Sequence, residues 1–371
     1  MLVGVPKEIK NNEFRVGLTP TAVREYVARG HSVLVETGAG LGIDATDAAY
    51  VAAGATIAAT AAEVFAKAGM VVKVKEPQPS EWVQLRPGQI LFTYLHLAPD
   101  PEQARGLMAS GVTAVAYETV TDAAGGLPLL APMSEVAGRL SIQAAATALQ
   151  KPNGGRGILL GGVPGVAPAR VVVIGGGVVG LHAARMAAGL GAEVTVLDRS
   201  VSRLRELDET FAGRVRTRYS TIDALEDEVL AADAVIGAVL IPGAAAPKLV
   251  SRAMLSRMKR GAVLVDVAID QGGCFETSHA TTHADPTYVV DGVIHYCVAN
   301  MPGAVALTSS HALNHATLPF GLALADDGLA AIARDPHLRN GLNIHRGRIT
   351  HPAVASALGE RFADPAEGLA A

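Results

Sequence analysis

The chain has 371 residues, of which 50% are hydrophobic and 18% are charged, and its formal net charge is −4. This composition excludes an intrinsically disordered protein, and the lack of a strongly basic stretch excludes a nucleic-acid-binding groove. Two cysteines are too few for a secreted disulfide framework and no apolar run is long enough to cross a bilayer, so we expect a cytoplasmic protein without nucleic-acid or membrane partners.

The first part of the chain alternates short runs of Val, Ile and Leu with segments of helical pattern. The predicted strands cover residues 2–6, 32–36, 70–75, 90–96 and 113–118. Thr19 followed by Pro20 predicts the start of a helix that runs to about residue 28, because Thr is a good N-cap and Pro fits the first helical turn. Strands that alternate with helices predict a parallel sheet covered on both faces.

An alanine-rich helix is predicted over residues 134–150, where it would join two domains, and the glycine-rich segment 153–165 is interpreted as a hinge. A second alternating series follows. Its predicted strands cover residues 171–175, 193–198, 234–240, 262–270 and 293–300. The last part, about 305–371, is expected to pack on the first domain, because a segment of that size buries too little surface alone.

These elements predict an α/β fold class with two doubly wound parallel-sheet domains. One of them would be a Rossmann domain that binds NAD and is inserted between the two segments of the other. We expect the substrate domain to comprise residues 1–130 and 305–371, and the Rossmann domain to comprise residues 131–304.

The strongest local motif is the glycine-rich turn that follows the first strand of the second series. Gly175 would permit the tight strand-to-helix turn, Gly177 would let the backbone approach a pyrophosphate, and Gly180 would let the helix pack closely on the strand. The helix that begins at Val178 and Val179 would direct N–H groups at the phosphates. A purely structural glycine turn is the alternative, but strand, turn, helix and second strand follow one another as a dinucleotide site requires.

The second strand of this motif ends in Asp198, whose carboxylate can accept hydrogen bonds from the adenosine ribose and would repel a 2′-phosphate. This favours NAD over NADP as the cofactor. Arg199 and Arg203 are a contrary indication, because an arginine nearby can accommodate the phosphate of NADP.

Ligands of open α/β sheets bind beyond the carboxyl ends of the strands. The polar candidates at these ends are Arg15, Lys75, His96, Asp270 and Asn300. Arg15 can bind a carboxylate through two parallel hydrogen bonds, and Lys75 adds a second positive charge. His96 can transfer protons near neutral pH, and Asp270 can orient or deprotonate an amine or a water molecule. The residues predict a cleft between the domains that binds a small carboxylate substrate beside the nicotinamide.

Other polar residues have structural interpretations. A lysine at a strand end is usually a solvated charge, and this interpretation fits Lys73, which shares a strand face with the candidate lysine. Cys274 and Cys297 have no partner at ligand spacing and are expected to be structural. His311 and His315 have the i, i+4 spacing of a metal pair, but a helix surface is the favoured interpretation, and no metal is predicted.

The chain resembles the bacterial L-alanine dehydrogenases, in the alanine dehydrogenase/pyridine nucleotide transhydrogenase family, over essentially its whole length. The matching motifs include VPKEIKNNEFRVGLTP at 5–20, KVKEP at 73–77, LFTYLHLA at 91–98, AYET at 116–119, VIGGGVVG at 173–180, LVDVAIDQGGCFE at 264–276 and YCVANMPGAV at 296–305. Together these motifs are highly specific for the family.

The resemblance implies NAD-dependent oxidative deamination of L-alanine to pyruvate and ammonia, a reversible reaction with hydride transfer to nicotinamide C4. It implies that Arg15 and Lys75 bind the substrate, that His96 is the acid/base, and that Asp270 is the second catalytic residue. It also implies that NAD is lined by Ser134, Asp198, Arg203, Ser220, Val239, Leu240, Val267, Ala268, Ile269, Asp270, Val298, Ala299, Asn300 and Met301. The implied assembly is a homohexamer.

Three positions depart from the family pattern, namely Leu307 after the NMP motif, His279 where a nucleotide-contacting arginine is expected, and Arg203 where relatives have lysine. Three other functions are alternatives. They are the soluble nucleotide-binding subunit of a proton-translocating NAD(P) transhydrogenase, an N-(carboxyalkyl)amino acid synthase, and a non-catalytic NAD-binding sensor. The candidate residues Arg15, Lys75 and His96 argue against the transhydrogenase subunit, and the same residues together with Asp270 argue against the sensor.

Overall fold

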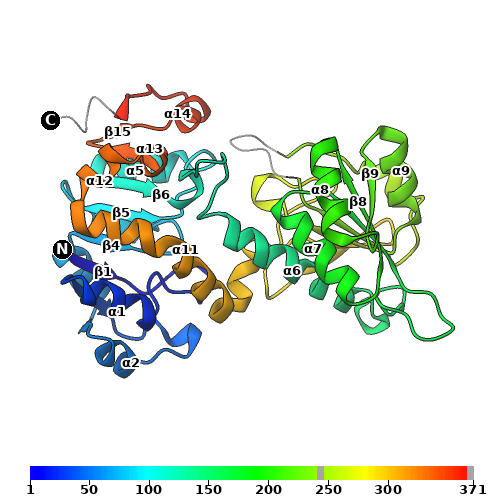
Figure 1. The fold of residues 1–371 in the computed structure, drawn as a ribbon, viewed down its shortest axis with the longest axis horizontal. Coiled ribbons are helices and arrows are strands. Elements are labelled where there is room, and N and C mark those ends of the chain that lie inside the picture. Colours follow the sequence, from blue (N-terminus) through cyan, green and yellow to red (C-terminus); the bar gives the residue numbers. More distant parts are fainter. Residues whose placement is uncertain (240–245, 366–371) are drawn as a thin grey trace. The chain divides into compact units, whose positions relative to one another are not determined.

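The computed structural model describes residues 1–239 and 246–365, and the chain divides into two compact units, each built around its own β-sheet (Figure 1). Unit 1 combines residues 1–133 with the segment that begins at Gly303, and unit 2 consists of residues 134–302. Among the residues described, no helix combines the length and the apolar character that crossing a membrane requires.

Unit 1 contains a sheet with the strand order β15-β14-β6-β5-β4-β1-β2-β3. Its parallel strands are β1 (Leu2–Val5), β2 (Ser32–Glu36), β3 (Thr56–Ala58), β4 (Met70–Val72), β5 (Ile90–Thr93) and β6 (Thr113–Ala116). Every residue of β4, β5 and β6 is buried, which explains why these strands are nearly continuous apolar runs. At the edge, β14 (Leu342–His345) pairs antiparallel with β6 and with β15 (Arg348–Ile349).

The helices of unit 1 come from both ends of the chain (Figure 1). They are α1 (Pro20–Ala28), α2 (Asp47–Ala52), α3 (Ala61–Lys67), α4 (Pro79–Trp82), α5 (Pro101–Ser110), α11 (Ala306–Asp327), α12 (Leu329–Arg334), α13 (Pro336–Asn340) and α14 (Pro352–Leu358), with 3-10 turns η1 (Leu41–Ile43) and η2 (Tyr117–Thr119). The predicted cap is confirmed, because the Thr19 hydroxyl accepts a hydrogen bond from the amide of Ala22. Asn314 of α11 accepts from the amide of Thr19 at 2.8 Å and donates to the carbonyl of Gly17 at 3.1 Å, so α11 is anchored to the start of α1.

Unit 2 contains a sheet with the order β12-β13-β11-β10-β7-β8-β9. Its strands are β7 (Arg170–Ile174), β8 (Glu193–Asp198), β9 (Arg216–Tyr219), β10 (Ala234–Gly237), β11 (Val263–Asp266), β12 (Thr287–Val290) and β13 (Val293–Tyr296). Its helices are α6 (Ala131–Ala148), which begins in unit 1, α7 (Val178–Gly189), α8 (Val201–Phe211), α9 (Ile222–Ala231) and α10 (Arg252–Leu255), with turns η3 (Lys151–Asn153), η4 (Ile269–Gln271) and η5 (Met301–Val305). The strands pair in parallel except β12, which is antiparallel to β13.

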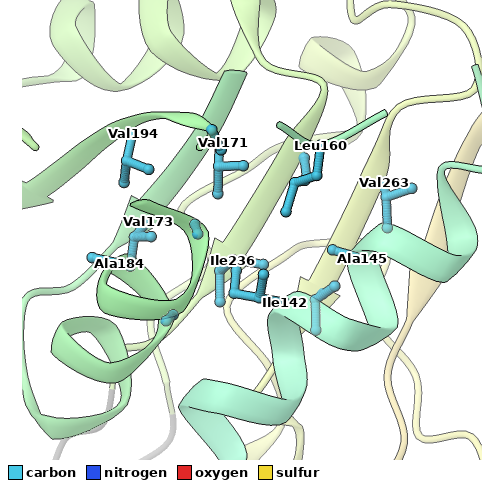
Figure 2. Packing of buried hydrophobic residues seen from close by; sticks show 14 of the residues in the cluster. Ile142, Ala145, Leu160, Val171, Val173, Ala184, Val194, Ile236 and Val263 are labelled. Carbon is cyan, nitrogen blue, oxygen red and sulfur yellow. The ribbon is translucent and has the colours of Figure 1, made fainter. Parts of the chain in front are cut away.

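The long alanine-rich helix is confirmed as α6, and it covers one face of the sheet of unit 2 (Figure 2). Ile142 and Ala145 of α6 share a buried apolar cluster with Ile236 of β10, Val263 of β11 and Ala184 of α7. Small side chains on both helices let them approach the strands closely, which is the packing that the high alanine content of this segment favours.

The predicted α/β fold class with two sheet domains is confirmed, but several predicted strand ends are wrong. The strands predicted over 70–75, 90–96, 262–270 and 293–300 end earlier, at Val72, Thr93, Asp266 and Tyr296. The apolar pattern was misleading because burial continues beyond the ladder, and both Val74 and Leu95 are 0% exposed outside any strand. β9 was not predicted because its sequence, RTRY, has no apolar alternation.

The expectation of a hinge at residues 153–165 is also wrong, because this segment lies inside unit 2 and the units divide after Met133 and Pro302. Its backbone is tied to other parts of unit 2. The amide of Arg156 donates to the carbonyl of Gly261 at 3.1 Å, and the amide of Gly157 donates to the carbonyl of Leu149 at 2.8 Å. The glycines permit tight turns here rather than movement between domains.

The packing of α7 on β7 leaves no room for a side chain at Gly180. A Cβ at this position would lie 1.8 Å from the carbonyl oxygen of Gly175, which is part of the backbone. We predict that Gly180→Ala lowers the free energy of unfolding by about 3 kcal/mol in urea denaturation, because α7 must shift away from the turn.

The matched control is Gly189→Ala, at the last residue of the same helix, where a Cβ would meet no atom within 4 Å. We expect this variant to be as stable as the parent or more stable by up to about 1 kcal/mol, since alanine has the higher helix propensity. Equal losses of stability in the two variants would contradict the packing explanation.

Candidate active site

Arg15 lies in the loop between β1 and α1, where Glu13 holds its guanidinium. Nε donates to Oε1 of Glu13 at 2.7 Å, Nη2 donates to Oε2 at 2.6 Å, and Nη1 donates to the sulfur of Met133 at 3.0 Å. Burial opposes the charged guanidinium, but the hydrogen bond and the charge of Glu13 outweigh this effect and raise the pKa of Arg15. Arg15 is therefore a buried and oriented cation at this edge of the sheet.

Lys75 follows β4 and is only 8% exposed. Its Nζ lies 3.7 Å from Oε2 of Glu76, whose Oε1 accepts a hydrogen bond from Lys10. Burial alone would raise the pKa of Glu76, but the charges of Lys75 and Lys10, the hydrogen bond from Lys10 and the charge of His96 together lower it. Glu76 is therefore an ionised carboxylate close to both Lys75 and His96.

His96 lies in the turn after β5 with a φ of 48°, in the left-handed region that residues other than glycine rarely adopt. Glu118, in η2 directly after β6, stabilises this turn. Its Oε1 accepts the amide of His96 at 2.6 Å, and its two oxygens accept the amide of Leu95 at 3.2 Å each. The ring of Tyr94 is stacked with the imidazole, with 5.7 Å between centroids and 9° between planes. The backbone of His96 is therefore held by Glu118, and its imidazole packs against Tyr94.

Unit 1 thus brings Arg15, Lys75 and His96 into one cluster. Tyr94 lies near two of them: its ring is stacked with the imidazole of His96, and the charge of Arg15 opposes the rise in the pKa of Tyr94 that burial causes. Glu76 connects Lys75 with His96. Glu13, Glu76, Tyr94 and Glu118 were not among the predicted site residues, although each lies inside one of the family motifs.

The interpretation of Lys73 as a solvated charge is wrong. Its side chain is 0% exposed, and its Nζ donates to Oε2 of Glu8 at 3.0 Å and to Oε1 of Glu81 at 2.8 Å. The pattern of the strand could not indicate this, because Glu8 is 65 residues away in the chain.

The glycine-rich turn after β7 is open on the side of the helix N-terminus. Gly175 has a φ of 98°, and Gly177, the N-cap of α7, has no atom within 4 Å of the place where a Cβ would stand. Asp198 at the end of β8 accepts the amide of Gly176 at 2.7 Å and the amide of Ser200 at 2.8 Å. The amides at the start of α7, a helix of 12 residues, can therefore bind an anionic group that approaches the backbone.

Two further candidates lie around this turn. Arg203 donates from Nε to the carbonyl of Gly176 at 2.6 Å, and its Nη1 lies 2.7 Å from a carboxylate oxygen of Glu206. The amide of Ser220 donates to the main-chain carbonyl of Asp198 at 2.9 Å. Asp198 and Arg203 thus both bind the main chain of Gly176 in the glycine turn, and Ser220 binds the main chain of Asp198.

The remaining cofactor candidates lie in several segments of unit 2. Val178 and Val179 open α7, Ser134 lies in α6, Val239 follows β10, Val267, Ala268 and Ile269 follow β11, and Val298, Ala299, Asn300 and Met301 follow β13. Asn300 has a φ of 60°, and its carbonyl lies 3.2 Å from Nε2 of His283. Leu240 lies outside the described residues.

Asp270 lies in η4 rather than at the strand end where it was predicted, and its side chain is exposed. The loop that carries it is organised by Asp266, which accepts the amide of Ala268 at 3.2 Å, the amide of Cys274 at 2.8 Å and the hydroxyl of Ser278. Burial raises the pKa of Asp266 and these hydrogen bonds oppose the rise. The loop is therefore built around a buried carboxylate that the sequence analysis did not single out.

The structure also places the other two departures from the family pattern, His279 and Leu307. The imidazole of His279 is stacked with the ring of Tyr288, with 3.6 Å between centroids and 25° between planes. Leu307 lies in the first turn of α11 and is 51% exposed.

The other polar candidates do not form a metal centre. Cys274 and Cys297 are buried and not joined by a disulfide, and burial raises the pKa of Cys274 to about 12. The rings of His311 and His315 lie 6.3 Å apart on α11. Within the described part of the chain, no group of three or more His, Cys, Asp or Glu residues could hold a metal ion.

A buried histidine, His295, lies in the sheet of unit 2. His295 is 0% exposed, its ring nitrogens lie 3.1 Å from the carbonyl of Val293 and 2.7 Å from the hydroxyl of Thr277, and burial lowers its pKa from 6.5 to about 4. A lowered pKa means that His295 binds the proton more tightly in the unfolded chain than in the folded protein. His295 therefore stabilises the fold above pH 6.5, and we predict that about 3 kcal/mol of this stabilisation is lost as the pH falls from 6.5 toward 4.

The measurement is the free energy of unfolding at a series of pH values. His295→Gln should flatten its pH dependence between pH 6.5 and 4, the range set by the shifted pKa. His315→Gln, which changes an exposed residue of α11, should leave that dependence as in the parent. A parent-like pH dependence in His295→Gln would contradict the assignment.

Comparison with known proteins covers nearly the whole chain. Residues 4–137 match the family described as "Alanine dehydrogenase/PNT, N-terminal domain", and residues 141–352 match "Alanine dehydrogenase/PNT, C-terminal domain". The alanine dehydrogenase of Halomonas elongata is 62% identical over 99% of this chain and 99% of that protein.

Two solved structures show the same architecture. One of an L-alanine dehydrogenase is 52% identical with a TM-score of 0.94, and the match covers 97% of this chain and 99% of that chain. The structure of a transhydrogenase from Sinorhizobium meliloti is 26% identical with a TM-score of 0.83, covering 94% of this chain and 100% of that chain.

Proposed function

The chain belongs to the alanine dehydrogenase/PNT family and is an oxidoreductase, and from this premise we propose that it catalyses NAD-dependent oxidative deamination of L-alanine to pyruvate and ammonia. The reaction is proposed to be reversible. The observation that carries the proposal is the cluster of Arg15, Lys75 and His96 in unit 1, in which Glu13, Glu76 and Tyr94 lie beside the guanidinium, the ammonium and the imidazole.

The residues of unit 2 fit a dinucleotide. No atom lies within 4 Å of the place where a Cβ of Gly177 would stand, so a pyrophosphate could approach the start of α7, and the Asp198 carboxylate retains acceptor capacity for ribose hydroxyls. A carboxylate there disfavours a 2′-phosphate, and Arg203 is already engaged with Gly176 and Glu206, so the proposed cofactor is NAD rather than NADP. When bound, NAD accepts the hydride from Cα of alanine at C4 of its nicotinamide.

Arg15 and Lys75 are proposed to bind the carboxylate end of the substrate. Glu13 fixes the plane of the guanidinium through two hydrogen bonds, so Arg15 loses little conformational freedom when a second carboxylate binds. Lys75 contributes a compact charge from the neighbouring strand end. A substrate carboxylate would meet two cations supplied by buried positions.

His96 is proposed to carry the proton transfers. Hydrolysis of the substrate imine requires a base that takes a proton from the attacking water and an acid that returns one to the departing ammonia. The neutral imidazole of His96 can do the first and its protonated form the second. Asp270 of unit 2 is proposed as the second catalytic residue, and the proposed assembly is a homohexamer.

We predict that His96→Ala lowers kcat by about 10²- to 10⁴-fold, the usual contribution of a general acid–base group, with little change in NADH affinity. Turnover would be measured in both directions and NADH binding by fluorescence titration. His315→Ala on the surface of α11 is the control and should retain parent activity. Parent-like turnover of His96→Ala would remove His96 from the mechanism.

The substrate is tested by NADH formation with a panel of L-amino acids, using the purified chain alone. We expect L-alanine to support the highest kcat/KM and NADP to be a poor replacement for NAD. Hydride exchange between two nucleotides without any amino acid would instead indicate a transhydrogenase activity. Preference for a substrate pair of amino acid and keto acid would indicate an N-(carboxyalkyl)amino acid synthase.

A further inference from the structure

Lys73 is a fully buried cation next to the substrate cluster, and the proposed reaction gives it no part. It directly follows β4, and its ammonium donates to Glu8 at 3.0 Å and to Glu81 at 2.8 Å. Burial opposes the charged ammonium, but the charges of Glu8 and Glu81 outweigh this effect and raise the pKa of Lys73. Lys73 therefore remains charged where water does not reach it.

Glu8 connects this cation with the main chain of Lys75. Oε2 of Glu8 accepts from the ammonium of Lys73, while Oε1 accepts the amide of Val74 at 2.6 Å and the amide of Lys75 at 3.4 Å. One carboxylate thus binds a side chain and the next two peptide N–H groups. These bonds fix the main chain at Lys75, just beyond the end of β4.

The ionisation of Glu8 depends on Lys73. Burial raises the pKa of Glu8, Lys73 opposes the rise, and the like charges of Glu13 and Glu81 add to it. Without the ammonium, Glu8 would be a buried carboxylate beside two others, which favours protonation or movement of its side chain. Either change would weaken its hold on the amides of Val74 and Lys75.

The other main-chain groups of residues 73–75 are held by neutral contacts from β5 and from the end of β6. The amide of Lys73 bonds to the carbonyl of Phe92, the amide of Tyr94 to the carbonyl of Val74, the hydroxyl of Tyr117 to the carbonyl of Lys73, and the hydroxyl of Thr93 to the carbonyl of Lys75. Among these contacts, only those made through Glu8 depend on a charge. The two amides bound by Glu8 are therefore the part of the arrangement that depends on the charge of Lys73.

A buried ion pair is a poor source of stability, because removing the charges from water costs about as much as their attraction returns. We propose instead that Lys73 is a positioning residue: it holds the Glu8 carboxylate so that Glu8 fixes the main chain of Lys75, and thereby the ammonium that binds the substrate carboxylate. This inference rests on the proposed role of Lys75. It assigns to Lys73 and Glu8 a role in substrate affinity that neither performs by contact.

The test is Lys73→Met, a substitution of similar length without charge, assayed in reductive amination. We expect KM for pyruvate to rise about tenfold or more while KM for NADH stays within about twofold of the parent. Combining it with Glu8→Gln and Glu81→Gln removes all three charges and keeps an amide oxygen that can accept the amide of Val74. This triple variant should recover part of the pyruvate affinity.

The matched control is Lys259→Met, which removes a lysine paired with the buried Asp233 of unit 2 at 2.9 Å. It should lower stability without changing KM for pyruvate. If Lys73→Met changes only stability, or raises both KM values together, the positioning role is overturned.

Two more variants distinguish a failure of Lys73→Met to fold from a wrong assignment of Lys75 as a substrate-binding residue. If Lys73→Met does not fold, Thr93→Val decides, because it removes only the hydroxyl that donates to the carbonyl of Lys75. A raised KM for pyruvate in Thr93→Val supports main-chain positioning of Lys75, and an unchanged value overturns it. Lys75→Ala tests the proposed function itself, and a parent-like KM for pyruvate there would place the failure in the assignment of Lys75.

Discussion

Main-chain amides just beyond the ends of parallel strands have lost their ladder partners, and in this protein buried or half-buried carboxylates accept them. Glu8 accepts the amides that follow β4, Glu118 those that follow β5, Asp198 one in the turn after β7, and Asp266 those in the loop after β11. A buried amide without a partner would cost about 1–3 kcal/mol. Lys75, His96, the glycine turn and Asp270 lie in the segments that these acids stabilise.

This arrangement lets the turns adopt conformations that would be unfavourable alone. His96 and Asn300 have φ values of 48° and 60°, although neither is a glycine, and Gly175 has 98°. Such conformations persist only where surrounding contacts over-determine them. For His96 these contacts are two hydrogen bonds from adjacent amides to Glu118 and the stacked ring of Tyr94. The proposed acid/base group is thus presented by a rigid turn, which suits a proton transfer that requires fixed geometry.

Each cation of the substrate cluster also has an acidic neighbour. Glu13 orients Arg15, and Glu76, balanced by Lys10, lies near Lys75. These acidic neighbours reduce the net positive charge of the cluster and orient the guanidinium of Arg15 and the ammonium of Lys75. In the proposed reaction, a carboxylate would meet donors that are already oriented, so less conformational entropy is lost on binding than with flexible lysines and arginines.

The sequence alone determined the alternation of strands and helices, the glycine turn and the polar residues after the strands, because each depends on neighbours within a few positions of the chain. It could not determine that Lys73 is buried rather than solvated, or that Glu118 and Asp266 organise the turns. Lys73 meets Glu8 across 65 residues, and His96 meets Glu118 across 22. Only the tertiary structure decides such pairs, because parallel strands bring together the ends of segments that the sequence keeps far apart.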